Sequence, residues 1–181
     1  MLNHGCQENA RGDVMKVLSI PEERVGVLIG EKGETLEEVR ELLQAEINVN
    51  GNEVEIISED PLEELRAYNI VKAIGRGFSP KRAFRLLERN SSIAVINISE
   101  FTDSDSDYSR LKGRVIGKKG MAKDKIESVT DTEVQVYGST VSVLGPMKGV
   151  EIAKKSVEML LNGSSHGNVY RFLENNIEKV L

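Results

Sequence analysis

Short apolar runs alternate with amphipathic stretches along the first half of the chain. Met15 to Ile20 is rich in branched apolar side chains and has the length of a β-strand. Between Leu36 and Leu43, apolar residues recur three and four positions apart, which predicts a helix. Two more short strands, Ile47 to Asn50 and Glu53 to Ile57, flank Gly51-Asn52, and glycine at the first loop position favours a type II′ hairpin. This pattern predicts a mixture of helices and antiparallel strands.

The same order of elements occurs twice. Val27 to Gly33, ending in Gly-Glu-Lys-Gly, returns 87 residues later as Arg114 to Gly120, ending in Gly-Lys-Lys-Gly. The first strand returns only 78 residues later, as Ile93 to Ile98, so the second copy carries nine extra residues after this strand. Each copy therefore predicts the order strand, short helix, Gly-x-x-Gly, longer helix, two strands, helix.

A further short helix is predicted after each copy, at residues 80–88 and 168–180. The helix before the second Gly-x-x-Gly is predicted from Tyr108 to Ile116. The fold class is α+β, with two domains at residues 14–90 and 91–181 after a disordered segment at 1–13. Apolar residues of the appended helices are interpreted as packing between domains: Leu86, Leu87, Val169, Phe172, Leu173, Ile177 and Val180.

The composition is that of a globular protein whose sequence offers neither a disulfide nor a structural zinc site. Hydrophobic residues make up 39% and charged residues 29% of the 181 residues. No apolar run reaches the length of about 20 residues that a membrane helix needs, and the N-terminus lacks a signal peptide pattern, so we expect a cytoplasmic protein. Cys6, His4 and His166 are the only cysteine and histidines, which predicts no disulfide, no metal site and no cofactor.

Charge is distributed unevenly between the two Gly-x-x-Gly regions. The net charge of −5 argues against a nucleic-acid partner. Residues 22–41 fit that argument, since they hold seven glutamates and three basic residues. Residues 110–125 hold one acidic residue, Asp124, and seven basic ones: Arg110, Lys112, Arg114, Lys118, Lys119, Lys123 and Lys125. The second region therefore has the positive charge that a phosphate backbone requires.

A Gly-x-x-Gly turn before a helix suits phosphate binding. Two glycines permit close approach of the backbone, and the helix N-terminus presents free N–H groups. We predict that Gly117, Lys118, Lys119 and Gly120 hold an RNA backbone, while the other five basic residues supply the surrounding field. Two interpretations remain open for Gly30, Glu31, Lys32 and Gly33: a duplicated turn kept for packing, or a secondary RNA site. His166 is either a turn residue between helices or an RNA contact.

The order of elements around each Gly-x-x-Gly resembles the type I KH domain. Such domains clamp about four single-stranded nucleotides along a narrow apolar groove. The resemblance implies two tandem type I KH domains and a groove lined by Val134, Gln135 and Val136. An aromatic stacking sheet is not expected, since aromatic residues make up only 4% of the chain.

Longer segments resemble one family of small-subunit ribosome-assembly proteins. They are Gly75 to Ala83 (GRGFSPKRA), Gly113 to Gly120 (GRVIGKKG) and Leu160 to Glu174 (LLNGSSHGNVYRFLE). The family is the partner-of-Nob, or dimethylase-interacting, family, here in its archaeal branch. The resemblance implies binding to small-subunit ribosomal RNA near its 3′ end. Met121-Ala122 departs from the Thr-Arg expected after the second motif glycine.

Other chemistries fit the sequence less well. A nucleotide-binding P-loop needs four residues between its glycines, and only three separate Gly113 from Gly117. Asp103, Asp105 and Asp107 alternate as in a calcium loop, but the required glycine and final glutamate are missing. No catalytic constellation is present, so we predict no enzyme. The alternative to RNA binding is a scaffold whose acidic first domain docks a basic protein, such as an initiation-factor subunit or a processing nuclease.

Overall fold

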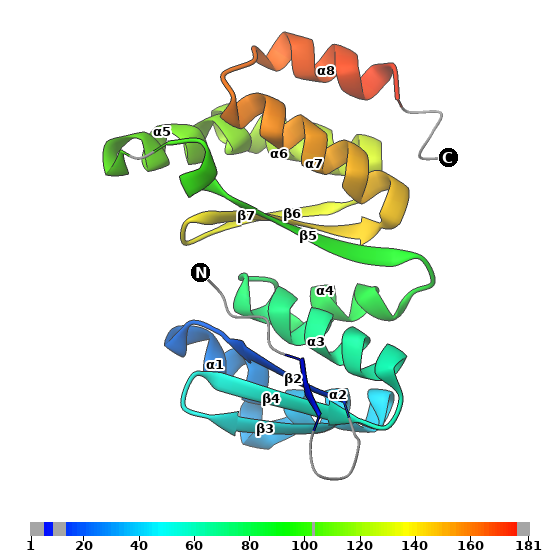
Figure 1. The fold of residues 1–181 in the computed structure, drawn as a ribbon. Coiled ribbons are helices and arrows are strands. Elements are labelled where there is room, and N and C mark those ends of the chain that lie inside the picture. Colours follow the sequence, from blue (N-terminus) through cyan, green and yellow to red (C-terminus); the bar gives the residue numbers. More distant parts are fainter. Residues whose placement is uncertain (1–5, 9–13, 103, 177–181) are drawn as a thin grey trace. The chain divides into compact units, whose positions relative to one another are not determined.

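The computed structural model describes residues 6–8, 14–102 and 104–176. The chain divides into two compact units between Leu87 and Glu88. Each unit consists of helices packed on an antiparallel sheet (Figure 1). Each also contains the predicted order of strand, helix, Gly-x-x-Gly, helix, two strands and helix. The α+β class and the internal repeat are therefore confirmed.

The first unit has a four-stranded sheet in the order β1-β2-β4-β3. Its strands are β1 (Cys6–Glu8), β2 (Val14–Ser19), β3 (Glu46–Asn50) and β4 (Glu53–Ser58). Its helices are α1 (Glu22–Ile29), α2 (Glu34–Leu43), α3 (Pro61–Gly75) and α4 (Pro80–Ala83), followed by a 3₁₀ turn at Phe84–Leu87. Alternate residues Val54, Ile56 and Ser58 of β4 are buried, because only one face of this sheet meets the core.

The second unit has a three-stranded sheet in the order β5-β7-β6. Its strands are β5 (Ser91–Asn97), β6 (Glu133–Tyr137) and β7 (Thr140–Pro146). Its helices are α5 (Asp105–Ile116), α6 (Met121–Thr130), α7 (Met147–Leu161) and α8 (His166–Glu174). Figure 1 shows α5, α6 and α7 on one side of this sheet. The core includes Val115, Ile126, Val143 and Val157, which are completely buried.

Strand register shows that the two copies are structurally equivalent. In the first unit Val54 lies opposite Val49 on one side and Leu18 on the other. In the second unit Val141 occupies the same place, between Val136 and Ile96. Leu18 and Ile96 are 78 residues apart and Val49 and Val136 are 87 residues apart, as the sequence comparison predicts. The nine extra residues of the second copy therefore follow β5. The chain there forms a 3₁₀ turn at Ile98–Glu100 and the first turn of α5.

The hairpin loops have the backbone geometry expected of type II′. Gly51 and Gly138 have φ of 61° and 54°, and the residues after them, Asn52 and Ser139, do not have positive φ. A type I′ turn would require positive φ at both positions. Glycine first in the loop therefore selects the turn, and the turn fixes the register of both hairpins.

Several boundaries differ from the sequence-based expectation, and the helix expected at residues 80–88 is α4 followed by the 3₁₀ turn. Cys6–Glu8 form a strand paired with β2, whereas we expected disorder; the rest of 1–13 lies outside the described residues. Helix α5 begins at Asp105, three residues before the predicted Tyr108. Helix α8 begins at His166, where Ser165 caps it by accepting a hydrogen bond from the Asn168 N–H, and it ends at Glu174. Residues 177–181, including Ile177 and Val180, lie outside the described residues.

The appended helix α8 packs into the core of its own unit. Val169 and Leu173 have no exposed surface, and Phe172 is partly buried against the same core cluster. This corrects the interpretation of these three residues as packing between domains: α7 leaves an apolar surface that α8 covers. No helix within the described part of the chain combines the length and apolar character needed to span a bilayer.

Candidate nucleic-acid interface

The two Gly-x-x-Gly turns have the same backbone conformation. In the second turn (Gly117–Gly120), φ and ψ are 75° and 175° at Gly117, and φ is 54° at Lys119 and 85° at Gly120. In the first turn (Gly30–Gly33), φ and ψ are 77° and 178° at Gly30, and φ is 54° at Lys32 and 91° at Gly33. The sequence Glu-Lys therefore folds into the same turn as Lys-Lys.

The first glycine of each turn is required by close approach to the following helix. A Cβ atom added at Gly117 would lie 2.6 Å from the Cβ of Ala122 and 2.8 Å from its backbone nitrogen. At Gly30 the corresponding obstacle is Thr35, whose backbone nitrogen would lie at 2.8 Å. The last glycine is different, because a Cβ at Gly120 would meet nothing closer than 3.6 Å. Its positive φ is what favours glycine there.

The turn leads directly into the N-terminus of α6, and helix N-termini favour anions. Gly120 is the N-cap residue of α6, and among the described residues no side chain forms a capping hydrogen bond with the first turn of this helix. The Met121 N–H donates to the Lys118 carbonyl oxygen, whereas the remaining N–H groups of that turn and the positive end of the helix dipole would suit a phosphate oxygen. Lys118 and Lys119 are both exposed beside it.

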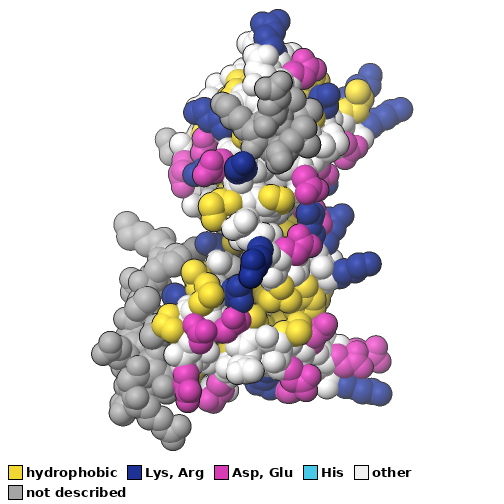
Figure 2. Space-filling model, turned by 90° about the vertical axis from the view of Figure 1, so that its right-hand side faces the viewer, with side chains coloured by type: hydrophobic (Ala, Val, Ile, Leu, Met, Phe, Trp, Pro, Cys, Tyr) yellow, Lys and Arg dark blue, Asp and Glu magenta, His cyan; other side chains and the backbone are white. Residues whose placement is uncertain are grey.

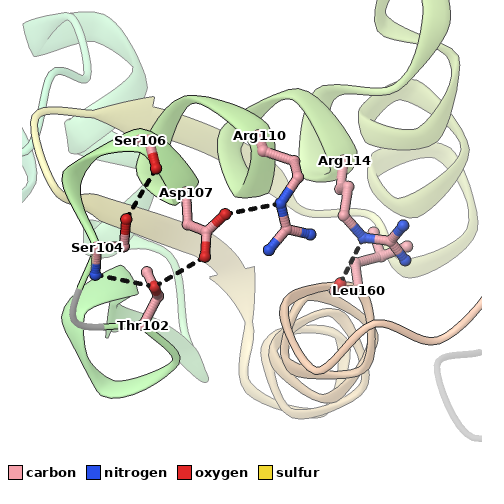
Figure 3. A network of polar contacts seen from close by, with 7 residues as sticks. All are labelled: Thr102, Ser104, Ser106, Asp107, Arg110, Arg114 and Leu160. Atoms are coloured by element: carbon pink, nitrogen blue, oxygen red, sulfur yellow. Dashed lines mark hydrogen bonds and ion pairs between the residues drawn. The ribbon is translucent and has the colours of Figure 1, made fainter.

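Three of the seven predicted basic residues are engaged within the protein. The Nε of Arg110 donates to Asp107 Oδ1 at 3.0 Å (Figure 3). This hydrogen bond lowers the pKa of Asp107. Lys123 Nζ lies 2.9 Å from Glu127 Oε1, and that oxygen also accepts a hydrogen bond from the Val134 N–H at 2.7 Å. These contacts neutralise much of the field expected from Arg110 and Lys123.

Arg114 clamps the end of α7 to α5. Its Nε donates to the carbonyl oxygen of Leu160 at 3.0 Å (Figure 3), and its Nη2 to that of Ser164 at 2.6 Å. His166 at the start of α8 also bonds α5, because its Nε2 donates to the Arg114 carbonyl oxygen at 2.8 Å. The Leu160 carbonyl also accepts the Gly163 N–H, so Arg114 adds to the bonds at the end of α7. Arg114, predicted as an RNA contact, thus has a structural role. His166, for which a turn residue and an RNA contact both remained open, also has structural contacts and lies at the junction of two helices.

The first unit contains an equivalent clamp, formed by an arginine at a different sequence position. Arg24 Nε donates to the Ile74 carbonyl oxygen at 2.8 Å, and its Nη2 to that of Phe78 at 2.6 Å. These carbonyls occupy the places of Leu160 and Ser164 in the repeat. Arg24 precedes its Gly-x-x-Gly by six residues and Arg114 by three, so the two arginines lie one helical turn apart. Sequence comparison of the copies could not have paired them.

We expect Arg114→Ala to lower the free energy of unfolding of the second unit by about 2 kcal/mol, because charged hydrogen bonds to two carbonyls are lost. Arg114→Lys keeps the charge but cannot reach both carbonyls with one nitrogen. It should therefore lose similar stability while changing RNA affinity less than about threefold, since the field is kept. Urea denaturation and fluorescence anisotropy measure the two effects. If Arg114→Lys were as stable as the wild type, the clamp would be unimportant.

Four lysines carry the unpaired positive charge of the second turn. Among the described residues, no ion pair or hydrogen bond is formed by the side chains of these four: Lys112, Lys118, Lys119 and Lys125. Asp124 lies on the first turns of α6 near Gly120. The usable footprint is therefore smaller than the seven residues counted from the sequence, and it is centred on the turn itself.

The first turn presents the opposite charge on the same backbone. Glu31 occupies the place of Lys118, and Glu34 and Glu37 lie in the first turn of α2. Arg40 pairs with Glu37, and Arg24 is occupied by the clamp. These charges would oppose phosphate binding, although the backbone conformation is that of the second turn.

The groove predicted beside the second turn is bounded by α6 and the edge strand β6. Val134 has no exposed surface and belongs to the core, so its side chain has no surface left for a base. Gln135 and Val136 are partly exposed. Because the Val134 N–H already donates a hydrogen bond to Glu127, a base would meet the side chains of Gln135 and Val136 rather than that donor.

Nothing among the described residues points to metal chemistry, since they contain no group of three or more His, Cys, Asp or Glu side chains able to hold an ion. Asp107 of the rejected calcium pattern bonds Arg110 and Thr102.

Family models match both copies. One described as the eukaryotic-type KH domain (KH-domain type I) matches residues 92–178, and one described as the KH domain matches residues 15–73. The prediction of two KH domains is therefore confirmed. The geometry above places a Gly-x-x-Gly turn at the same point in each.

Curated proteins with similar sequences include archaeal and eukaryotic members. A KH domain-containing protein of Methanocaldococcus jannaschii is 42% identical over 171 residues, covering 92% of this chain and 75% of that protein. The pre-rRNA-processing proteins PNO1 of Schizosaccharomyces pombe and Chaetomium thermophilum are 31% and 30% identical. The matches span 58% and 53% of those two proteins, which are longer than this chain.

Solved structures resemble the whole chain. A crystal structure of an a/eIF2α–aDim2p–rRNA complex from Pyrococcus horikoshii matches with a TM-score of 0.85 and 40% identity, covering 92% of this chain and 96% of that chain. Dim2p from the same organism matches with a TM-score of 0.83 and 42% identity, covering 89% and 98%. The similarity thus extends over both units.

Proposed function

We propose, since the chain belongs to the PNO1/Dim2 family of KH-domain proteins, that it binds single-stranded small-subunit ribosomal RNA near its 3′ end during ribosome assembly or rRNA processing. The observation that carries the RNA-binding site is the second turn, where exposed lysines flank an uncapped helix N-terminus. The 3′-end target follows from the family resemblance. We propose a binding role without catalysis, exercised in the cytoplasm.

The proposed mechanism separates backbone binding from base reading. The N–H groups of Gly117 and Gly120 are engaged within the backbone, so N–H groups in the first turn of α6 donate to one phosphate. Lys118 and Lys119 contact its neighbours through charge. Lys112 and Lys125 widen this positive surface. Bases then lie between α6 and β6 against Gln135 and Val136, where the KH-domain resemblance implies a groove for unpaired nucleotides. The first turn serves as a supporting copy in this proposal.

Binding should weaken steadily with salt. Single-stranded binding releases roughly 0.7 counterions per phosphate contact, so a clamp on about four nucleotides gives a slope of about −3 for log K against log salt concentration. Fluorescence anisotropy with short oligoribonucleotides of the 3′-end sequence measures it. A slope near zero would contradict an electrostatic clamp. A duplex of the same sequence is the control, and we expect it to bind more weakly because its bases cannot enter the groove.

A second candidate function is docking of a protein partner by the first unit. Its Gly-x-x-Gly region is acidic, and a related chain was crystallised together with a/eIF2α as well as rRNA. A basic initiation-factor subunit or processing nuclease would be attracted to such a surface. The two functions are compatible, since they use different units.

A further inference from the structure

Three leucines are unusually exposed on the first unit. The exposed fractions of Leu42, Leu62 and Leu65 are 53%, 53% and 43%. Leu62 and Leu65 lie three residues apart at the start of α3, so they share one helix face. Figure 2 shows exposed hydrophobic side chains on this unit with acidic side chains beside them. Single exposed leucines are ordinary, but neighbouring ones indicate a surface that meets another molecule.

The repeat shows that the fold does not need Leu62 and Leu65. Helices α3 and α7 both have 15 residues and occupy the same place in their units. The positions of Leu62 and Leu65 correspond to Lys148 and Glu151, which are exposed in the second unit. The same scaffold therefore carries charged residues where nothing apolar is required. These two leucines are a departure specific to the first copy, whereas Leu42 corresponds to Val129, which packs against the core.

An acidic hollow lies at the same end of the first unit. It has a volume of about 480 Å³ and lies where α2 ends, β3 begins, β4 ends and α3 begins. Its lining residues are Leu43, Gln44, Glu46, Ile57, Ser58, Glu59, Asp60 and Glu63. Leu42 adjoins Leu43 in the chain, and Leu62 lies between Asp60 and Glu63. The leucines and the hollow thus form one surface, here called the leucine–acid surface.

Negative charge dominates this surface. Four carboxylates line the hollow, and none of the described residues that line it is a lysine or an arginine. Glu63 pairs with Arg66 at 2.6 Å, which offsets one of them. Asp60 accepts a hydrogen bond from the Leu62 N–H at 2.8 Å as the cap of α3. The surface therefore combines apolar contact area with about three uncompensated negative charges.

We propose that the leucine–acid surface docks a basic amphipathic segment of a partner protein. Leucine side chains of such a segment would cover Leu62 and Leu65, and its lysines or arginines would face the carboxylates of the hollow. RNA is disfavoured because its phosphates would meet those carboxylates. A second copy of this chain is disfavoured because a two-fold contact would bring the same acids together. The proposal is independent of the RNA site on the second unit.

The test uses the full chain and a defined peptide. The probe is a fluorescein-labelled helical peptide of about 16 residues with leucines on one face and lysines on the other. The matched peptide carries glutamate in place of every lysine. We expect the lysine peptide to bind with micromolar affinity and the glutamate peptide not to bind. Amide chemical shifts should change at residues 42–46 and 57–66 on titration of the labelled protein.

The matched variant exchanges the leucines for the residues of the second copy. Leu62→Lys with Leu65→Glu leaves the net charge unchanged, removes the apolar contact and places a lysine beside the carboxylates of the hollow. We expect at least a tenfold loss of affinity for the lysine peptide, with RNA affinity and unfolding midpoint unchanged. Met147→Lys, at an exposed methionine of α7 with an exposed fraction of 52%, is the control and should bind the peptide like the wild type.

Several outcomes would overturn the proposal. They are equal binding of the lysine peptide to the double variant, equal binding of both peptides, and displacement of the peptide by the RNA oligonucleotide. A wild-type dimer that becomes a monomer in the double variant would identify a second copy as the occupant. Because the RNA measurement is made on the same samples, failure here is distinguishable from failure of the RNA-binding function.

Discussion

Replacing Lys118 and Lys119 by Asp should weaken RNA binding about 100-fold. The double variant changes the charge beside the phosphate by four units, and each unit at about 6 Å in water is worth about 0.7 kcal/mol, or about 3 kcal/mol in total. Aspartate also tolerates the left-handed conformation that Lys119 adopts at φ of 54°, so the turn itself should persist. Fluorescence anisotropy with a 3′-end oligoribonucleotide measures the loss.

The repeat supplies a matched control for this experiment. Glu31→Asp with Lys32→Asp installs the same two side chains at the same two backbone positions of the first unit. We expect a change in RNA affinity below about threefold, because this turn is already surrounded by glutamates. Circular dichroism must show that both variants are folded. Equal loss of binding in the two variants would mean that both turns contact one continuous strand of RNA.

The two turns show that backbone geometry and charge are separate requirements for phosphate binding. Conformations at Gly30 and Gly117 agree within a few degrees, as do those at Lys32 and Lys119. What differs is the residue at the second position, Glu31 or Lys118, and the acids of the helix that follows. The first unit thus has the backbone of the second turn beside acidic side chains, which would oppose phosphate binding.

The repeat and the hairpins were predictable because their signals are local. Apolar periodicity and the glycine of each two-residue loop decide them, and the register in both sheets agrees with the sequence offsets. The strand at Cys6–Glu8 was not predictable, since a three-residue strand exists only by pairing with β2. The start of α5 at Asp105 was not predictable either, because its first three residues, Asp105 to Asp107, are polar and show no apolar periodicity.

The composition of the candidate site was only partly predictable. The sequence locates the basic cluster, but it cannot show which side chains are already engaged. Arg114 looks like one more cation beside the motif, yet its guanidinium is directed to the carbonyls of Leu160 and Ser164, 46 and 50 residues away. Val134 likewise looks suitable for a groove, and burial places it in the core. Long-range contacts of this kind leave no periodic pattern in the sequence.

Replacing Gly117 by Ala should destabilise the second unit by about 3 kcal/mol or more. Two costs combine there, since φ of 75° with ψ of 175° is a region that is essentially restricted to glycine, and the new Cβ would lie 2.6 Å from that of Ala122. Neither obstacle can move without shifting the start of α6, so RNA binding should also be lost. Gly120→Ala is the matched control within the same turn. It has positive φ but open space, and it should cost only about 1 kcal/mol. Chemical denaturation of both variants measures the difference, and equal losses of stability would show that close approach to the helix is not what requires glycine at the first position.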